Sequence, residues 1–170
     1  GESTKTGEGL YPAARARDIK AVVDQLHLAP VVLVGWSMGV TEVAAYMDQF
    51  GTRGIAGIVL VDGVAGGMDA QFAKAIMDLG AKLQADRRKQ TEAFVRSMYR
   101  KPQSEDYIQR VTNATLGTPT NSAVALFVGA FGADYRAALP KINVPTLVLA
   151  AGDDASNPFL AKYKEMQQAI

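Results

Sequence analysis

Two kinds of hydrophobic pattern alternate along the chain. Three stretches, at 31–34, 55–61 and 144–150, consist almost entirely of uncharged β-branched or aliphatic residues. Runs of this length and composition are typical of strands buried on both faces of a parallel sheet. Apolar residues at helical spacing predict helices over 12–26 and from residue 38 to about residue 50. Strands that alternate with helices predict the α/β class, a parallel sheet with flanking helices joined by right-handed crossovers.

Residues 66–139 carry a different pattern, with helical periodicity and no strand-like run. Glycine and proline separate the helical stretches: Gly80, Pro102, Gly117 and Pro119. We expect the aromatic and Met residues of this segment, such as Phe94 and Met98, to form a core of its own. Three parts are therefore predicted. Residues 1–65 and 140–170 form the core that contains the sheet, and residues 66–139 form a helical cap inserted between them.

The sequence Gly35-Trp36-Ser37-Met38-Gly39 joins the first predicted strand directly to a helix. A chain that reverses this sharply crowds its own backbone, and we expect Gly35 and Gly39 to relieve that crowding. The turn would expose Ser37 at the carboxyl end of the strand and at the positive N-terminus of the helix, where a developing oxyanion is favoured. The pattern therefore predicts a serine presented for chemistry.

Composition narrows the possible functions. With 170 residues the chain can form one domain with a substantial core. The 18 Lys and Arg nearly balance the 17 Asp and Glu, so the net charge does not favour binding to nucleic acid or to an anionic membrane. The longest apolar run is too short to span a bilayer. The absence of Cys excludes disulfides and thiolate metal sites, and a single His argues against an imidazole site. We expect no cofactor and no metal, and the localisation stays open because the chain does not begin with Met.

The order of these features resembles the α/β-hydrolase family. A G-x-S-x-G turn between strand and helix is followed by a further strand, a helical insertion and the sequence "VPTLVLAAGDD…P". The chain is most similar to the capped esterases and the cofactor-free haloperoxidase-like members. The resemblance implies that Ser37 is the nucleophile, that Gly35, Trp36 and Gly39 complete its elbow, and that the backbone N–H of Met38 supplies one oxyanion-hole donor.

The catalytic acid has three candidates. In the family a proline-led strand ends in a loop that carries an aspartate and, later, a proline. Placing Pro145 and Pro158 on those two prolines puts Asp154 at the acid position, and Asp153, one residue away, is the second choice. Asp62 is the third, because some members take their acid from the end of the preceding strand. The favoured interpretation of Asp62, however, is a loop residue at the strand end with no catalytic role.

The resemblance also requires a histidine after the acid, and the only histidine is His27. Residues 31–36 are expected to be extended and to cover about 20 Å, which places His27 near the opposite end of the strand from Ser37. His27 is therefore not expected to be the general base. The resemblance implies that the catalytic histidine and the second oxyanion donor come from segments outside residues 1–170 or from another chain. At least one edge of the sheet is expected to be unpaired without them.

Three functions remain open at this point. The first is a serine hydrolase that cleaves a small ester or related acyl substrate through an acyl-enzyme. The second uses the same site with hydrogen peroxide as the acceptor, the perhydrolase chemistry attributed to haloperoxidase-like relatives. The third is a non-catalytic α/β module. Since serine without a base is a poor nucleophile, we expect the 170 residues alone to be almost inactive.

Overall fold

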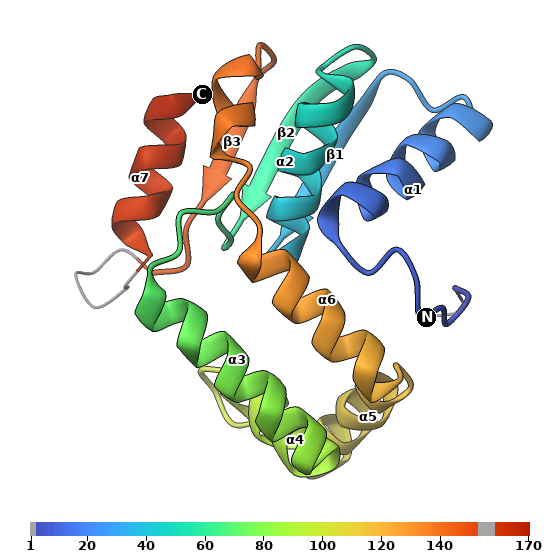
Figure 1. Cartoon of the computed structure of the whole chain (residues 1–170), viewed down its shortest axis with the longest axis vertical. Helices are drawn as coiled ribbons and strands as arrows, with labels where there is room; N and C mark the ends of the chain where they lie inside the picture. The colour runs from blue at the N-terminus through green and yellow to red at the C-terminus, as the bar shows by residue number, and fades with distance from the viewer. Residues whose placement is uncertain (1–2, 153–158) are drawn as a thin grey trace. The chain divides into compact units, whose positions relative to one another are not determined.

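The structure is a computed structural model that describes residues 3–152 and 159–170. Its sheet has three parallel strands in the order β1-β2-β3: β1 (Val31–Trp36), β2 (Ile55–Val61) and β3 (Thr146–Leu149). All three run in the same direction (Figure 1). The α/β class and parallel sheet predicted from the sequence are confirmed, with β2 at its predicted bounds and β3 shorter than expected.

Helices lie against one side of the sheet (Figure 1). The elements that do so are α1 (Pro12–Gln25), α2 (Met38–Phe50), α7 (Leu160–Ala169) and the 3-10 helix η1 (Arg136–Lys141). Helix α1 begins at its proline, which suits the first turn of a helix. Helix α2 ends at Gly51, whose positive φ of 65° stops the helix. Both helices agree with the sequence-based prediction to within about one residue.

The core lies between α2 and the covered face of the sheet. The apolar stripe of α2 is buried, and its members are Val40, Val43, Ala44 and Met47. Ile58 and Leu60 of β2 meet this stripe, and Tyr163 and Met166 of α7 join the same cluster. Burial of this stripe is the main source of stability for the elbow region, because helices in proteins are held chiefly by their packed apolar face.

The opposite face of the sheet is open in the described part of the chain. Val32, Val34 and Trp36 of β1 and Leu147 and Leu149 of β3 are all exposed. The strand register brings them into rows, with Trp36 beside Val61 and Val61 beside Leu149. The prediction that the strands are buried on both faces is therefore wrong for the described residues. Strands β1 and β3 are the two edges of the described sheet, as expected for a sheet with an unpaired edge.

Four helices lie between β2 and η1 in the sequence: α3 (Ala70–Ala85), α4 (Arg87–Ser97), α5 (Glu105–Leu116) and α6 (Thr120–Gly132). Pro102, Gly117 and Pro119 fall between helices as predicted, but Gly80 lies inside α3, where it is buried. Phe94 and Met98 were predicted to be core residues, yet both are exposed. Val95 and Ile108, on α4 and α5, are buried instead.

The chain divides into two compact units. One consists of Gly1–Leu10 and Ala70–Val128, and the other of Tyr11–Asp69 and Gly129–Ile170. The second unit holds the sheet, α1, α2, η1 and α7, and we call it the sheet unit. The predicted domain bounds of 66 and 139 stay a prediction. Among the described residues, no helix is both long enough and apolar enough to cross a membrane.

Candidate active site

Ser37 occupies a strained turn between β1 and α2. Its backbone has φ 53° and ψ −117°, a conformation that non-glycine residues rarely adopt. The N–H of Ser37 donates to the carbonyl of Val61 at 2.9 Å, and the N–H of Val40 donates to the carbonyl of Ser37 at 3.1 Å. The expected sharp turn is confirmed. Such strain persists only where the surroundings determine it, and it is common at functional sites.

The two glycines of the turn differ in their roles. A Cβ on Gly35 would lie 2.5 Å from the carbonyl oxygen of Gly39, well inside any real contact. A Cβ on Gly39 itself would meet no atom within 4 Å. The expected crowding is therefore present at Gly35, and the expectation for Gly39 is wrong. Gly39 contributes instead the backbone carbonyl against which Gly35 packs.

Met38 is the first residue of α2. The first N–H groups of a helix have no partner within the helix, so they are suited to bind an anion. This position fits the oxyanion donor that the resemblance assigns to the backbone N–H of Met38, and that role stays a prediction. The side chain of Trp36, by contrast, extends onto the open face of the sheet.

The carboxyl ends of the strands bring the candidate residues to one edge of the sheet. Trp36, Val61 and Leu149 form one row across the three strands. The residues that directly follow the three strands, Ser37, Asp62 and residue 150, therefore lie at the same edge of the sheet. Asp153 and Asp154 lie outside the described residues, so the assignment of Asp154 as the acid stays a prediction.

Asp62 is held in place by two hydrogen bonds. Its N–H donates to the carbonyl of Leu149 at 2.8 Å, and its Oδ1 accepts from the hydroxyl of Tyr163 at 2.8 Å. Its φ of 45° is positive, as at Ser37. Burial raises the pKa of Tyr163 well above its usual value, and the hydrogen bond to Asp62 raises that pKa further. Tyrosine is protonated at neutral pH in any case, and the raised pKa extends the range over which this hydroxyl donates to more alkaline pH.

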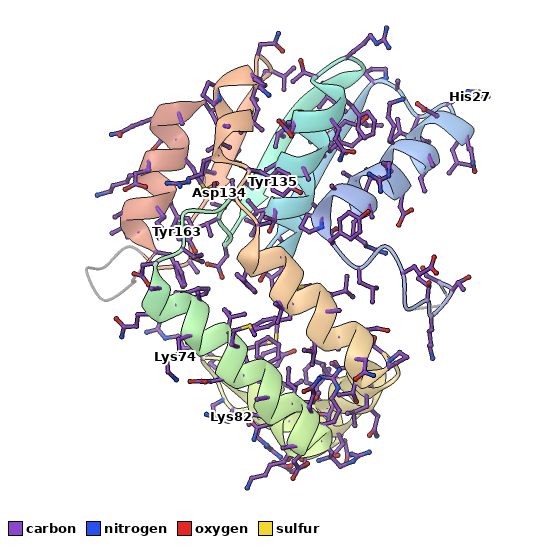
Figure 2. The ribbon with its side chains drawn as sticks, in the orientation of Figure 1. His27, Lys74, Lys82, Asp134, Tyr135 and Tyr163 are labelled. Carbon is purple, nitrogen blue, oxygen red and sulfur yellow. The ribbon has the colours of Figure 1, made fainter. Side chains whose placement is uncertain are left out.

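His27 lies at the other end of the sheet unit. It follows the end of α1 and is exposed, and Figure 2 shows it beyond that end of the helix. The six residues of β1 separate its end of the sheet from Ser37, a span of about 20 Å at 3.3 Å per residue. A general base must come within about 3 Å of the proton that it abstracts, so His27 cannot serve Ser37.

In residues 3–152 and 159–170, no three or more His, Cys, Asp or Glu side chains are grouped so that they could hold a metal ion.

Comparison with known proteins decides the family. A family model described as "Alpha/beta hydrolase family" matches residues 2–170. The chain belongs to the alpha/beta-hydrolase family. The resemblance and the fold class inferred from the elbow and the strand order are thus confirmed.

Individual relatives of this alpha/beta hydrolase agree with the fold. The bromoperoxidase of Bacillus anthracis has a TM-score of 0.88 at 24% identity, and the esterase EaEST of Exiguobacterium antarcticum has a TM-score of 0.89 at 23% identity. Each structure is matched over 100% of this chain and 66% of its own. The AB hydrolase superfamily protein YisY of Bacillus subtilis is 27% identical over 169 residues, which cover 94% of this chain and 62% of the relative. The alpha/beta hydrolase described by residues 1–170 therefore spans slightly less than two thirds of these relatives.

Sequence reasoning did not find Tyr163 or Gly63 among the site residues. Tyr163 lies 101 positions after Asp62, so no local pattern joins them. Gly63 stands two residues after the end of β2, where no pattern in the sequence singled it out. The structure shows a close backbone contact there: a Cβ on Gly63 would lie 2.3 Å from the carbonyl oxygen of Ser37.

Proposed function

We propose that this alpha/beta hydrolase is a serine hydrolase that cleaves carboxylic esters or related acyl substrates. The observation that carries the proposal is the strained backbone of Ser37 at the carboxyl edge of a parallel sheet, directly before a helix N-terminus. In this proposal Ser37 Oγ attacks the acyl carbon and the alcohol leaves. Water then attacks the acyl-enzyme, which releases the acid and restores the serine.

The other catalytic roles follow the family pattern. The N–H of Met38 stabilises the oxyanion, and Asp154 orients the histidine that accepts the proton of Ser37. Since His27 is the only histidine in residues 1–170 and lies far from Ser37, we propose that sequence outside these residues supplies the base. The substrate is a small ester, and the proposal includes no nucleic acid, membrane or cofactor.

Three preparations test this function with p-nitrophenyl acetate. The first is residues 1–170 alone, and the second is the same residues joined to the segments that EaEST has outside the matched region. The third is the joined protein with Ser37→Ala. We expect turnover near background for the first, clear turnover for the second and a loss of about 10³-fold or more for the third.

A fluorophosphonate probe adds a direct readout, because it labels an activated serine covalently. Mass spectrometry of the joined protein should place the label on Ser37. His27→Ala is the matched control, and it should leave both labelling and turnover unchanged. Esterase activity of residues 1–170 alone that survives His27→Ala would contradict the proposed origin of the base, and activity that survives Ser37→Ala would contradict the nucleophile.

A second function uses the same acyl-enzyme. The similarity to a bromoperoxidase favours testing hydrogen peroxide as the acceptor, which would give a peracid and the free serine. Hydrolysis and perhydrolysis of one acetate ester, measured on the same preparation, separate the two functions.

A further inference from the structure

Two of the strained residues lie side by side at the carboxyl edge of the sheet. Ser37 follows β1 with φ 53°, and Asp62 follows β2 with φ 45°. The residues that precede them, Trp36 and Val61, are direct neighbours in the sheet. A strained backbone persists only where its surroundings determine it, so each turn needs contacts that hold it. The contacts of Asp62 show what holds the second turn.

Tyr163 of α7 supplies the side-chain contact to Asp62. The tyrosine is 4% exposed, and its hydroxyl donates to Asp62 Oδ1 at 2.8 Å. Figure 2 shows Tyr163 on the sheet unit, near the edge where β2 and β3 end. A hydrogen bond to a carboxylate is stronger than one between neutral groups, and burial of the donor strengthens it further. This bond therefore fixes the turn after β2 to α7.

The turn after β2 also packs against the elbow at Ser37. A Cβ at Gly63 would lie 2.3 Å from the carbonyl oxygen of Ser37 and 2.7 Å from Val40 Cγ2. On the other side of the serine, its N–H donates to the carbonyl of Val61. The segment 61–63 thus contacts the backbone of Ser37 through both its N–H and its carbonyl. A shift of this segment would displace the serine.

Helix α7 makes a second contact farther along the same loop. Lys162, the neighbour of Tyr163, donates to the carbonyl of Gly67. Two adjacent residues of α7 thus hold the two ends of the loop 62–67. The contacts are all within the sheet unit, so they do not depend on the placement of the helices α3 to α5.

We propose that Tyr163 and Asp62 are positioning residues that hold the elbow of Ser37 in its reactive geometry. The proposal rests on the proposed function, in which Ser37 is the nucleophile. In this proposal Asp62 holds the turn after β2 through Oδ1, which accepts the tyrosine hydroxyl, and does not orient a histidine. A displacement of about 1 Å at a reacting atom can cost about 100-fold in rate, so a loosened elbow would lower turnover.

The first test measures the elbow itself by hydrogen exchange. Tyr163→Phe removes the hydroxyl but keeps the buried ring, so the protein should fold. The amides of Ser37, Val40 and Asp62 all donate to backbone carbonyls, and we expect them to exchange about tenfold faster in Tyr163→Phe. Tyr99→Phe is the matched control, because its hydroxyl pairs with that of Tyr107 at 3.1 Å in the other unit. Tyr99→Phe should leave the three elbow amides unchanged.

The second test separates positioning from acid catalysis by turnover. Asp62→Asn retains an oxygen that accepts from Tyr163, and Asn tolerates a positive φ as well as Asp does. In the preparation that shows Ser37-dependent turnover, we expect Asp62→Asn to keep most of the kcat. Tyr163→Phe should lower kcat about tenfold and leave KM unchanged, since the substrate-binding surface is intact.

Each outcome decides between the two roles. Unchanged exchange at the elbow amides in Tyr163→Phe would overturn the proposal. A loss of about 10³-fold in Asp62→Asn with little effect of Tyr163→Phe would overturn it as well and assign Asp62 as the acid. If no preparation shows Ser37-dependent turnover, the proposed function fails, and the exchange measurement alone still supports or overturns the link between Tyr163 and the elbow.

Discussion

Gly35→Ala should destabilise the protein although it adds a single methyl group. The new Cβ would lie 2.5 Å from the carbonyl oxygen of Gly39, 2.7 Å from its carbonyl carbon and 2.9 Å from the backbone nitrogen of Val40. All three atoms belong to the backbone, so no side chain can turn away to make room. The strand and the first turn of α2 would have to move apart, and the elbow between them holds Ser37.

The size of the effect follows from two opposing contributions. Overpacking a tight site costs about 1–3 kcal/mol and sometimes more, and a contact at 2.5 Å with the backbone belongs at the upper end. The alanine also restricts the unfolded chain, which stabilises the fold by about 0.4–1 kcal/mol. We expect a net loss of about 2 kcal/mol in the free energy of unfolding.

Gly39→Ala is the matched control, four residues away in the same turn. Its Cβ would meet no atom within 4 Å, and its position in the first turn of α2 favours alanine over glycine. We expect it to leave stability unchanged or raise it by up to about 1 kcal/mol. Urea unfolding followed by circular dichroism measures both variants, and their m-values should equal that of the wild type. Equal stability of the two variants would refute the reasoning from backbone contact.

Three further predictions concern other parts of the sheet unit. Trp36 is the only tryptophan and is 58% exposed, so its fluorescence should have the emission of a water-exposed indole and be quenched by acrylamide; a shielded, blue-shifted emission would show that the open sheet face is covered in solution. Burial raises the pKa of Glu42, with Arg15 opposing, so the folded state binds the proton more tightly than the unfolded chain. Its contribution to stability is thus present at low pH and lost as the pH rises through the folded pKa. Glu42→Gln should flatten the stability profile above about pH 4, where the unfolded carboxyl begins to ionise, and an unchanged profile would contradict this. In the joined protein, Asp154→Asn should reduce turnover by about 10³-fold or more with the fold intact, whereas unchanged turnover would exclude Asp154.

The sequence predicted the elements whose ends carry local signals. Helix α2 stops where Gly51 and Gly54 follow it, and α1 begins at Pro12, so both agree with the periodic pattern. The elbow was predictable for the same reason, because a glycine-flanked serine between a strand and a helix is a local pattern.

The features that were missed depend on contacts between distant segments. Val32 and Val34 are apolar whether or not another layer covers them, so periodicity could not reveal that this face is open. Gly80 could not be distinguished from a helix break, because an isolated glycine is tolerated within a helix at a cost of about 1 kcal/mol. The bond between Tyr163 and Asp62 joins residues 101 positions apart and leaves no local signal.

The sheet register brings the chain segments of two candidate acids to the same edge of the sheet. Because Trp36, Val61 and Leu149 form one row, both Asp62 and the chain that leads to Asp154 leave the sheet at the same edge as Ser37. Position alone therefore cannot decide between them. Asp62 accepts the hydroxyl of a buried tyrosine at Oδ1, and a carboxylate that makes this one bond still has lone pairs that can accept the N–H of a histidine. Turnover of Asp154→Asn and Asp62→Asn, measured side by side in the joined protein, therefore decides: if Asp62 supports the elbow and Asp154 is the acid, only Asp154→Asn should lose about 10³-fold, and the reverse result would exchange the two roles.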